Sequence, residues 1–133
     1  MLGARQTGFQ GEEIAAGFLQ DKGWELLARN WRHGSYELDL VCRDGDTVVF
    51  VEVKTRDQGG LTRPDQAFTR EKQRRMIKAA QYWLAEHKAW SSPCRFDLVC
   101  VNVRQEHYQT ELISHVVELG QTSHRGHAAW QPW

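Results

Sequence analysis

The pattern of apolar and polar residues along the chain predicts seven elements in the order α-β-β-β-α-β-β. Apolar residues at helical spacing predict two helices, over residues 11–22 and 70–88, and Thr69 is placed to cap the second. Runs rich in β-branched and aromatic residues predict five strands, over residues 24–31, 36–42, 48–55, 96–103 and 112–118. This order indicates one α/β domain over residues 1–119, with a mixed central sheet flanked by the helices.

Two segments fall outside this pattern. Residues 57–64 contain glycine, proline and polar residues, which predict a loop. Residues 120–133 are polar with isolated tryptophans, and we expect them to form a flexible C-terminal tail.

Two neighbouring strands carry charges in apolar surroundings. Glu52 and Lys54 stand in the run Val48–Thr55, and Asp39 stands in the strand before it. Side chains alternate between the faces of a strand, so a hairpin of these two strands can place Asp39 and Glu52 on one face. Two neighbouring acids repel one another when both are ionised, so each raises the pKa of the other. A divalent cation that binds oxygen ligands removes this repulsion. The alternative is a pair of ordinary surface charges, with Glu52 and Lys54 forming a salt bridge.

A row of basic residues predicts a surface for a polyanion on the second helix. Arg70, Arg74 and Lys78 are spaced at i, i+4 and i+8, so they line one helix face. Lys72 flanks them, and Arg32, Arg56 and Arg63 can extend the surface. The alternative is a solvated helix face, but beside a metal site such a row becomes a path for phosphates.

Composition narrows the class of protein. The chain has 133 residues and a formal net charge of zero, which argues against a general nucleic-acid coat protein and still permits a local basic patch. Its three cysteines are odd in number, as expected for reduced thiols in the cytoplasm. No apolar run is long enough to be a secretory signal or a membrane span, so we expect a cytoplasmic protein without a membrane partner.

The ordered set of motifs resembles the PD-(D/E)xK nuclease superfamily, which includes restriction endonucleases and archaeal Holliday-junction resolvases. Within it, the chain resembles the bacterial YraN-type family, which is similar to the resolvases. The matching segments are residues 11–15, 30–32, 37–41 and 50–56, together with Lys72 and residues 95–99. One departure is Tyr36, which stands where the family usually has glycine, although the glutamate that follows it is present as Glu37.

The resemblance implies a restriction endonuclease-like core and assigns a role to each matching site residue. Asp39 and Glu52 match the two carboxylates that bind Mg²⁺ or Mn²⁺, and the backbone carbonyl of Val53 is a candidate third ligand. Lys54 matches the lysine that acts on the attacking water or on the phosphate. Glu12 matches the acid of the first helix. Two further acids are secondary candidates, Glu13 and Glu37.

The function that follows from these roles is metal-dependent hydrolysis of phosphodiester bonds in DNA, with branched or single-stranded DNA favoured. The first alternative is a nucleic-acid-binding module on the same fold that has no turnover. A second alternative is a recruiting protein that works through its tryptophan-bearing tail. The resolvases act as dimers, so the resemblance also suggests a homodimer, with a monomer as the alternative.

Overall fold

The computed structural model describes residues 4–57 and 68–117, and the predicted order of elements is confirmed. The bounds of the elements are α1 (Ala4–Asp21), β1 (Glu25–His33), β2 (Tyr36–Asp44), β3 (Thr47–Asp57), α2 (Arg70–Glu86), β4 (Cys94–Arg104) and β5 (His107–Ile113). Residues 58–64 of the predicted loop and the tail from residue 120 lie outside the described residues. Among the residues that are described, no helix is both long and apolar enough to span a bilayer.

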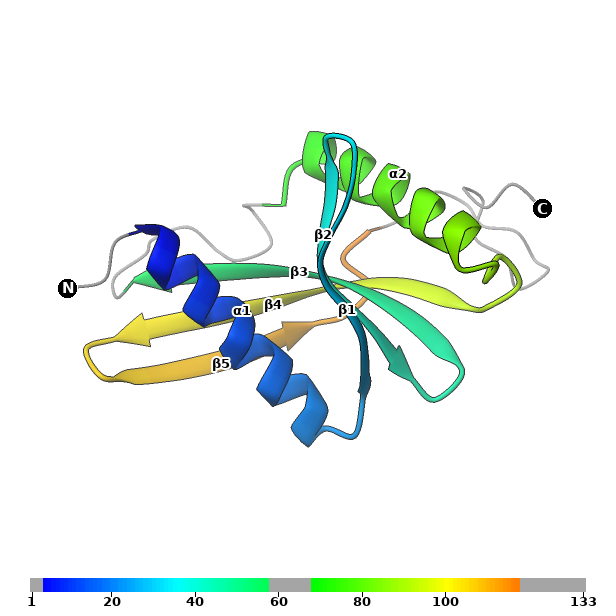
Figure 1. The fold of residues 1–133 in the computed structure, drawn as a ribbon. Coiled ribbons are helices and arrows are strands. Elements are labelled where there is room, and N and C mark those ends of the chain that lie inside the picture. The colour runs from blue at the N-terminus through cyan, green and yellow to red at the C-terminus, as the bar shows by residue number, and fades with distance from the viewer. Residues whose placement is uncertain (1–3, 58–67, 118–133) are drawn as a thin grey trace.

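The five strands form one mixed sheet in the order β1-β2-β3-β4-β5 (Figure 1). The pair β3–β4 is parallel and the other three pairs are antiparallel. Parallel neighbours need a long crossover connection, and the segment that contains α2 provides it. The mixed sheet predicted from the sequence is therefore confirmed.

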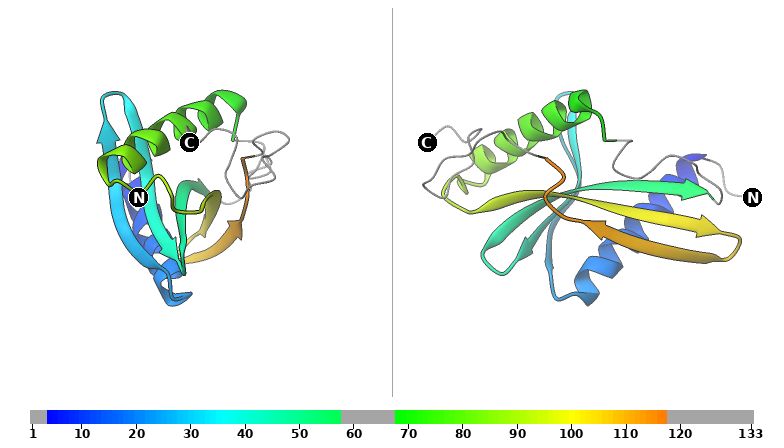
Figure 2. Two further views of the ribbon diagram at one scale, coloured as in Figure 1. Left: turned by 90° about the vertical axis from the view of Figure 1, so that its right-hand side faces the viewer. Right: turned by 180° about the vertical axis from the view of Figure 1, so that it is seen from behind.

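The two helices cover opposite faces of the sheet (Figure 2). Val49 and Val51 pack in one buried cluster with α1, whereas Val48 and Phe50 pack in the other with α2. This alternation along β3 is the period of two expected of a strand that is buried on both faces. The helix α2 begins after Thr69, whose hydroxyl oxygen accepts a hydrogen bond from the backbone N–H of Lys72 at 3.2 Å, so the predicted N-cap is confirmed.

Three predicted boundaries are wrong. The first helix begins at Ala4 rather than at residue 11, and β1 continues past Asn30 to His33 although Asn30 has a positive φ of 48°. The last strand spans His107–Ile113 rather than residues 112–118, because a short turn joins it directly to β4. Most of β5 is polar, and an edge strand can be polar because it has no second neighbour to cover it.

A close approach of backbone holds α1 against β3. A Cβ atom on Gly11 would overlap the hydroxyl oxygen of Thr55 and would lie 3.1 Å from the Thr55 Cβ atom. Glycine therefore lets the helix lie this close to β3, and Glu12 is the next residue along the helix.

Gly11→Ala is expected to lower the free energy of unfolding by about 1 to 3 kcal/mol, because the added methyl group forces α1 away from β3. Gly17→Ala is the matched control, since a Cβ atom on Gly17 meets nothing within 4 Å. That change is expected to raise stability by up to about 1 kcal/mol through the helix propensity of alanine. Urea unfolding of both variants checks this, and equal gains for the two would contradict the close approach.

Candidate functional site

The candidate site lies where β2 and β3 separate. Their backbone ladder ends at the pair Leu40 and Val51, and one more step of the register places Asp39 opposite Glu52. The backbone N–H of Val53 donates instead to Oδ2 of Asp39, at 2.9 Å. The side chains of Asp39 and Glu52 lie close enough for each to shift the pKa of the other. The two acids therefore meet on one face of adjacent strands, as the alternation of side chains predicts.

Burial makes this pair of acids difficult to ionise. It raises the pKa of Asp39 from its ordinary value of 3.8 to about 8, and the charge of Glu52 adds to the rise. The hydrogen bond from Val53 acts in the opposite direction. Burial likewise raises the pKa of Glu52. Without a metal, the pair therefore tends to keep a proton at neutral pH.

Two lysines balance the charge of Glu52. Lys72, in the first turn of α2, is the charge that lowers the pKa of Glu52 most, and Lys54 adds a smaller contribution from β3. Lys72 is exposed and Lys54 is half-buried. The helix therefore brings a second cation to the acids, in addition to the lysine of the Glu-x-Lys motif.

Of the three remaining predicted acids, two lie near Asp39 and one lies elsewhere on the surface. Glu12 is half-buried and its charge raises the pKa of Asp39, so it belongs to the same electrostatic cluster. Glu13 is exposed and lines a groove between α1 and β5 with Tyr108, away from Asp39. Glu37 raises the pKa of both Asp39 and Glu52 and pairs with Arg32 at 3.3 Å. Of the two helix-one candidates, only Glu12 lies near the paired acids.

Asp39→Asn is expected to stabilise the metal-free protein, with a gain that grows as pH rises from about 4 to about 8. Because the folded-state pKa lies above the unfolded value, Asp39 contributes most at low pH and that contribution is lost as pH rises towards about 8. Urea unfolding at about pH 5 and about pH 8 measures the difference. Asp46→Asn, an exposed acid of the β2–β3 turn, serves as the control. An equal shift at both pH values would contradict the raised pKa.

The site offers oxygen atoms, which are the ligands that a hard divalent cation such as Mg²⁺ binds. The carboxyl groups of Asp39 and Glu52 stand opposite one another, and the N–H and C=O of a strand residue point to the same side, so the Val53 carbonyl faces them too. Within residues 4–57 and 68–117, however, no group of three or more His, Cys, Asp or Glu side chains is arranged to hold a metal ion. A bound ion would have to draw on the Val53 carbonyl or on solvent as well.

The predicted basic residues lie in several places. Arg70, Arg74 and Lys78 are exposed on α2, and Arg74 is paired with Glu71 at 2.7 Å. Arg56 is half-buried on β3, two residues after Lys54 and hence on the same face. Arg63 lies outside the described residues. The row on α2 therefore faces solvent, and one of its members already has an acidic partner.

Sequence reasoning gave too little weight to the residues that join α2 to the β1–β2 hairpin. Arg75 donates to the carbonyl oxygen of Ser35 at 2.8 Å and lies over the ring of Tyr36. The rings of His33 and Tyr82 stack at 4.0 Å. The only signal in the sequence was the helical spacing of Lys72, Arg75 and Tyr82, which share one face of α2.

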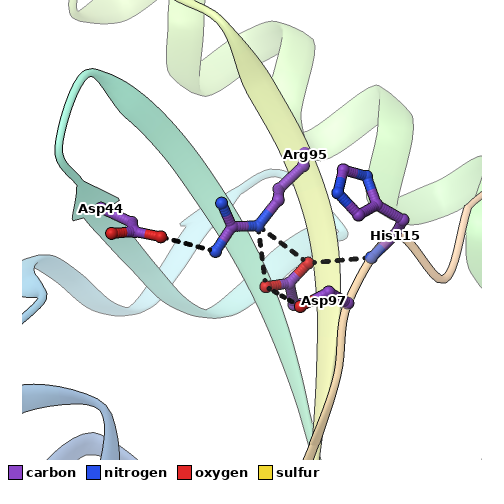
Figure 3. Close-up of polar contacts among 5 residues, drawn as sticks. Asp44, Arg95, Asp97 and His115 are labelled. Atoms are coloured by element: carbon purple, nitrogen blue, oxygen red, sulfur yellow. Dashed lines mark hydrogen bonds and ion pairs between the residues drawn. The ribbon is translucent and has the colours of Figure 1, made fainter. Parts of the chain in front are cut away.

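Asp97, from the last matching segment, belongs to a separate cluster (Figure 3). Its carboxylate is fully buried and accepts hydrogen bonds from the Arg95 side chain at 3.0 Å, from the hydroxyl of Ser114 at 3.3 Å and from the backbone N–H of His115 at 3.1 Å. Arg95 also pairs with Asp44, the last residue of β2, at 3.0 Å. These partners saturate Asp97, so its role is to join β4 to its neighbours.

Comparison with known proteins identifies the family of this chain. A model of the "Uncharacterised protein family UPF0102" matches residues 11–101. A UPF0102 protein of Nitratidesulfovibrio vulgaris is 51% identical over 134 residues, which cover 100% of both chains. One of Lawsonia intracellularis is 43% identical over 96% of this chain and 97% of its own. One of Geobacter metallireducens is 39% identical over 86% of this chain and 94% of its own. The chain therefore belongs to the UPF0102 family, the YraN-type family that its motifs resemble.

Proposed function

We propose that this protein is a metal-dependent nuclease with a restriction endonuclease-like core, which hydrolyses phosphodiester bonds in DNA. The observation that carries the proposal is the placement of Asp39 opposite Glu52, on one face, where β2 and β3 separate. A desolvated pair of acids raises the free energy of the folded protein, and such a cost is typical of a functional site. A structural salt bridge would need only one acid and one base.

Each residue of the site has a distinct task in this proposal. Asp39, Glu52 and the Val53 carbonyl would hold Mg²⁺ or Mn²⁺, which supplies charge neutralisation at the phosphate and a more acidic water. Lys54 and Lys72 come from different elements, β3 and α2, and both act on Glu52, so one can orient the attacking water while the other contacts a phosphate oxygen. Glu12 and Glu37 add negative charge that favours a cation at Asp39.

The binding-only alternative uses the same residues without turnover. Its basic surface would remain, but it gives no reason for two acids to be buried opposite one another, since acids repel a polyanion. The placement of Asp39 opposite Glu52 therefore favours the nuclease.

Titration calorimetry with Mn²⁺ tests the proposed ligands. Asp39→Asn and Glu52→Gln are each expected to weaken Mn²⁺ binding by at least about tenfold, since each removes one of two carboxylates. Lys54→Met is the matched control, because it removes a charge from the same strand face without removing an oxygen donor. Unchanged affinity in both acid variants would show that these residues do not bind the metal.

A further inference from the structure

A row of aromatic rings runs from β1 across to α2. The rings of Trp31 and His33 lie 6.2 Å apart at 19°, and those of His33 and Tyr82 lie 4.0 Å apart at 16°. Tyr36 adjoins Tyr82 at 5.7 Å with a tilt of 39°. His33 is exposed and the other three rings are half-buried. The row therefore lies at the rim of the core beneath α2, against which Trp31 and Tyr36 pack, and His33 is its exposed member.

Two cations lie on this row. The guanidinium of Arg75 is 4.8 Å from the ring centre of Tyr36, and the ammonium of Lys78 is 5.5 Å from that of Tyr82. Both basic residues are exposed. We call these six residues the hairpin surface: Trp31, His33, Tyr36, Arg75, Lys78 and Tyr82. The nearest acid on the hairpin, Glu37, is paired with Arg32.

The hairpin surface adjoins the candidate site. Tyr36 precedes Asp39 by three residues on β2, and Arg75 follows Lys72 by one helical turn on α2. Along the helix axis, Lys72 and Lys78 are separated by about 9 Å. In Figure 1 the β1–β2 hairpin lies beside α2, and α2 contacts both of its strands.

We propose that the hairpin surface binds an unpaired DNA strand and leads it to the paired acids. This inference rests on the proposed function and names the form of its substrate. Bases stack on aromatic rings, and Lys and Arg contact the phosphates between them. A duplex keeps the faces of its bases stacked on one another, so it can offer this surface its phosphates alone.

The test is fluorescence anisotropy with a labelled single strand and with the duplex of the same sequence, both in a metal chelator so that no cleavage occurs. His33→Ala and Tyr82→Leu are each expected to weaken single-strand binding by about tenfold and duplex binding by less than about twofold. Tyr108→Leu is the control, because it changes a tyrosine that is 57% exposed on β5, at the opposite edge of the sheet. Lys78→Gln is expected to flatten the slope of log affinity against log salt by about 0.7 for the single strand.

Two results would overturn the inference. One is a protein that does not bind the single strand, and the other is ring variants that bind it as tightly as the native protein or lose single strand and duplex equally. His33 is exposed, so His33→Ala decides the matter even if Tyr82→Leu does not fold. Ring-dependent binding in a protein that never cleaves DNA would refute the nuclease alone. Cleavage with ring-independent binding would refute the hairpin surface alone.

Discussion

Asp97→Ala is expected to lower the free energy of unfolding by about 3 to 5 kcal/mol. The change removes a carboxylate that is fully buried and leaves Arg95, whose side chain is only 17% exposed, without its buried acidic partner. It also removes the acceptor for the hydroxyl of Ser114 and the backbone N–H of His115. Urea unfolding of the purified variant measures the loss.

Asp44→Ala provides a control on the same arginine. Its side chain is 42% exposed and makes one ion pair with Arg95 at 3.0 Å, so its removal is expected to cost no more than about 1 kcal/mol. Asp97 and Asp44 each make one ion pair with Arg95, so we attribute the larger loss of unfolding free energy to the burial of Asp97. Similar losses of unfolding free energy in the two variants would contradict this.

The pairing of Asp39 with Glu52 could be predicted from the sequence because it depends on short-range rules. Side chains alternate along a strand, and a short connection between two strands leaves few registers. These rules place Asp39 beside Glu52 and leave Val53 on the other face of β3. The order of elements follows from periodicity in the same way.

The hairpin surface depends on contacts that no local rule contains. His33 and Tyr82 lie 49 positions apart in the sequence and meet only because α2 packs beside the tip of the β1–β2 hairpin. The strand β5 was misplaced for a related reason, since its polar residues lack the apolar pattern by which strands are recognised. The sequence predicts Lys72 among the phosphate contacts, and only the packing of α2 brings its charge to bear on Glu52.

Lys54→Met is expected to reduce the rate of DNA cleavage by about 100-fold or more while Mn²⁺ binding persists, since removing one preorganised charged donor at a reacting group has this effect. Asp39→Asn and Glu52→Gln are expected to bring cleavage to background, because they remove the metal ligands themselves. Gel assays at saturating metal and DNA separate the two classes. Activity of Lys54→Met within about threefold of the native protein would leave Lys54 a structural role only.

The most direct measurement is cleavage of branched, single-stranded and duplex DNA by the pure native protein with Mg²⁺ or Mn²⁺, run beside Asp39→Asn. The proposal predicts metal-dependent products from the native protein on the branched or single-stranded DNA and none from the variant. Tight binding without cleavage of any of these DNAs, or equal cleavage by the native protein and Asp39→Asn, would contradict it.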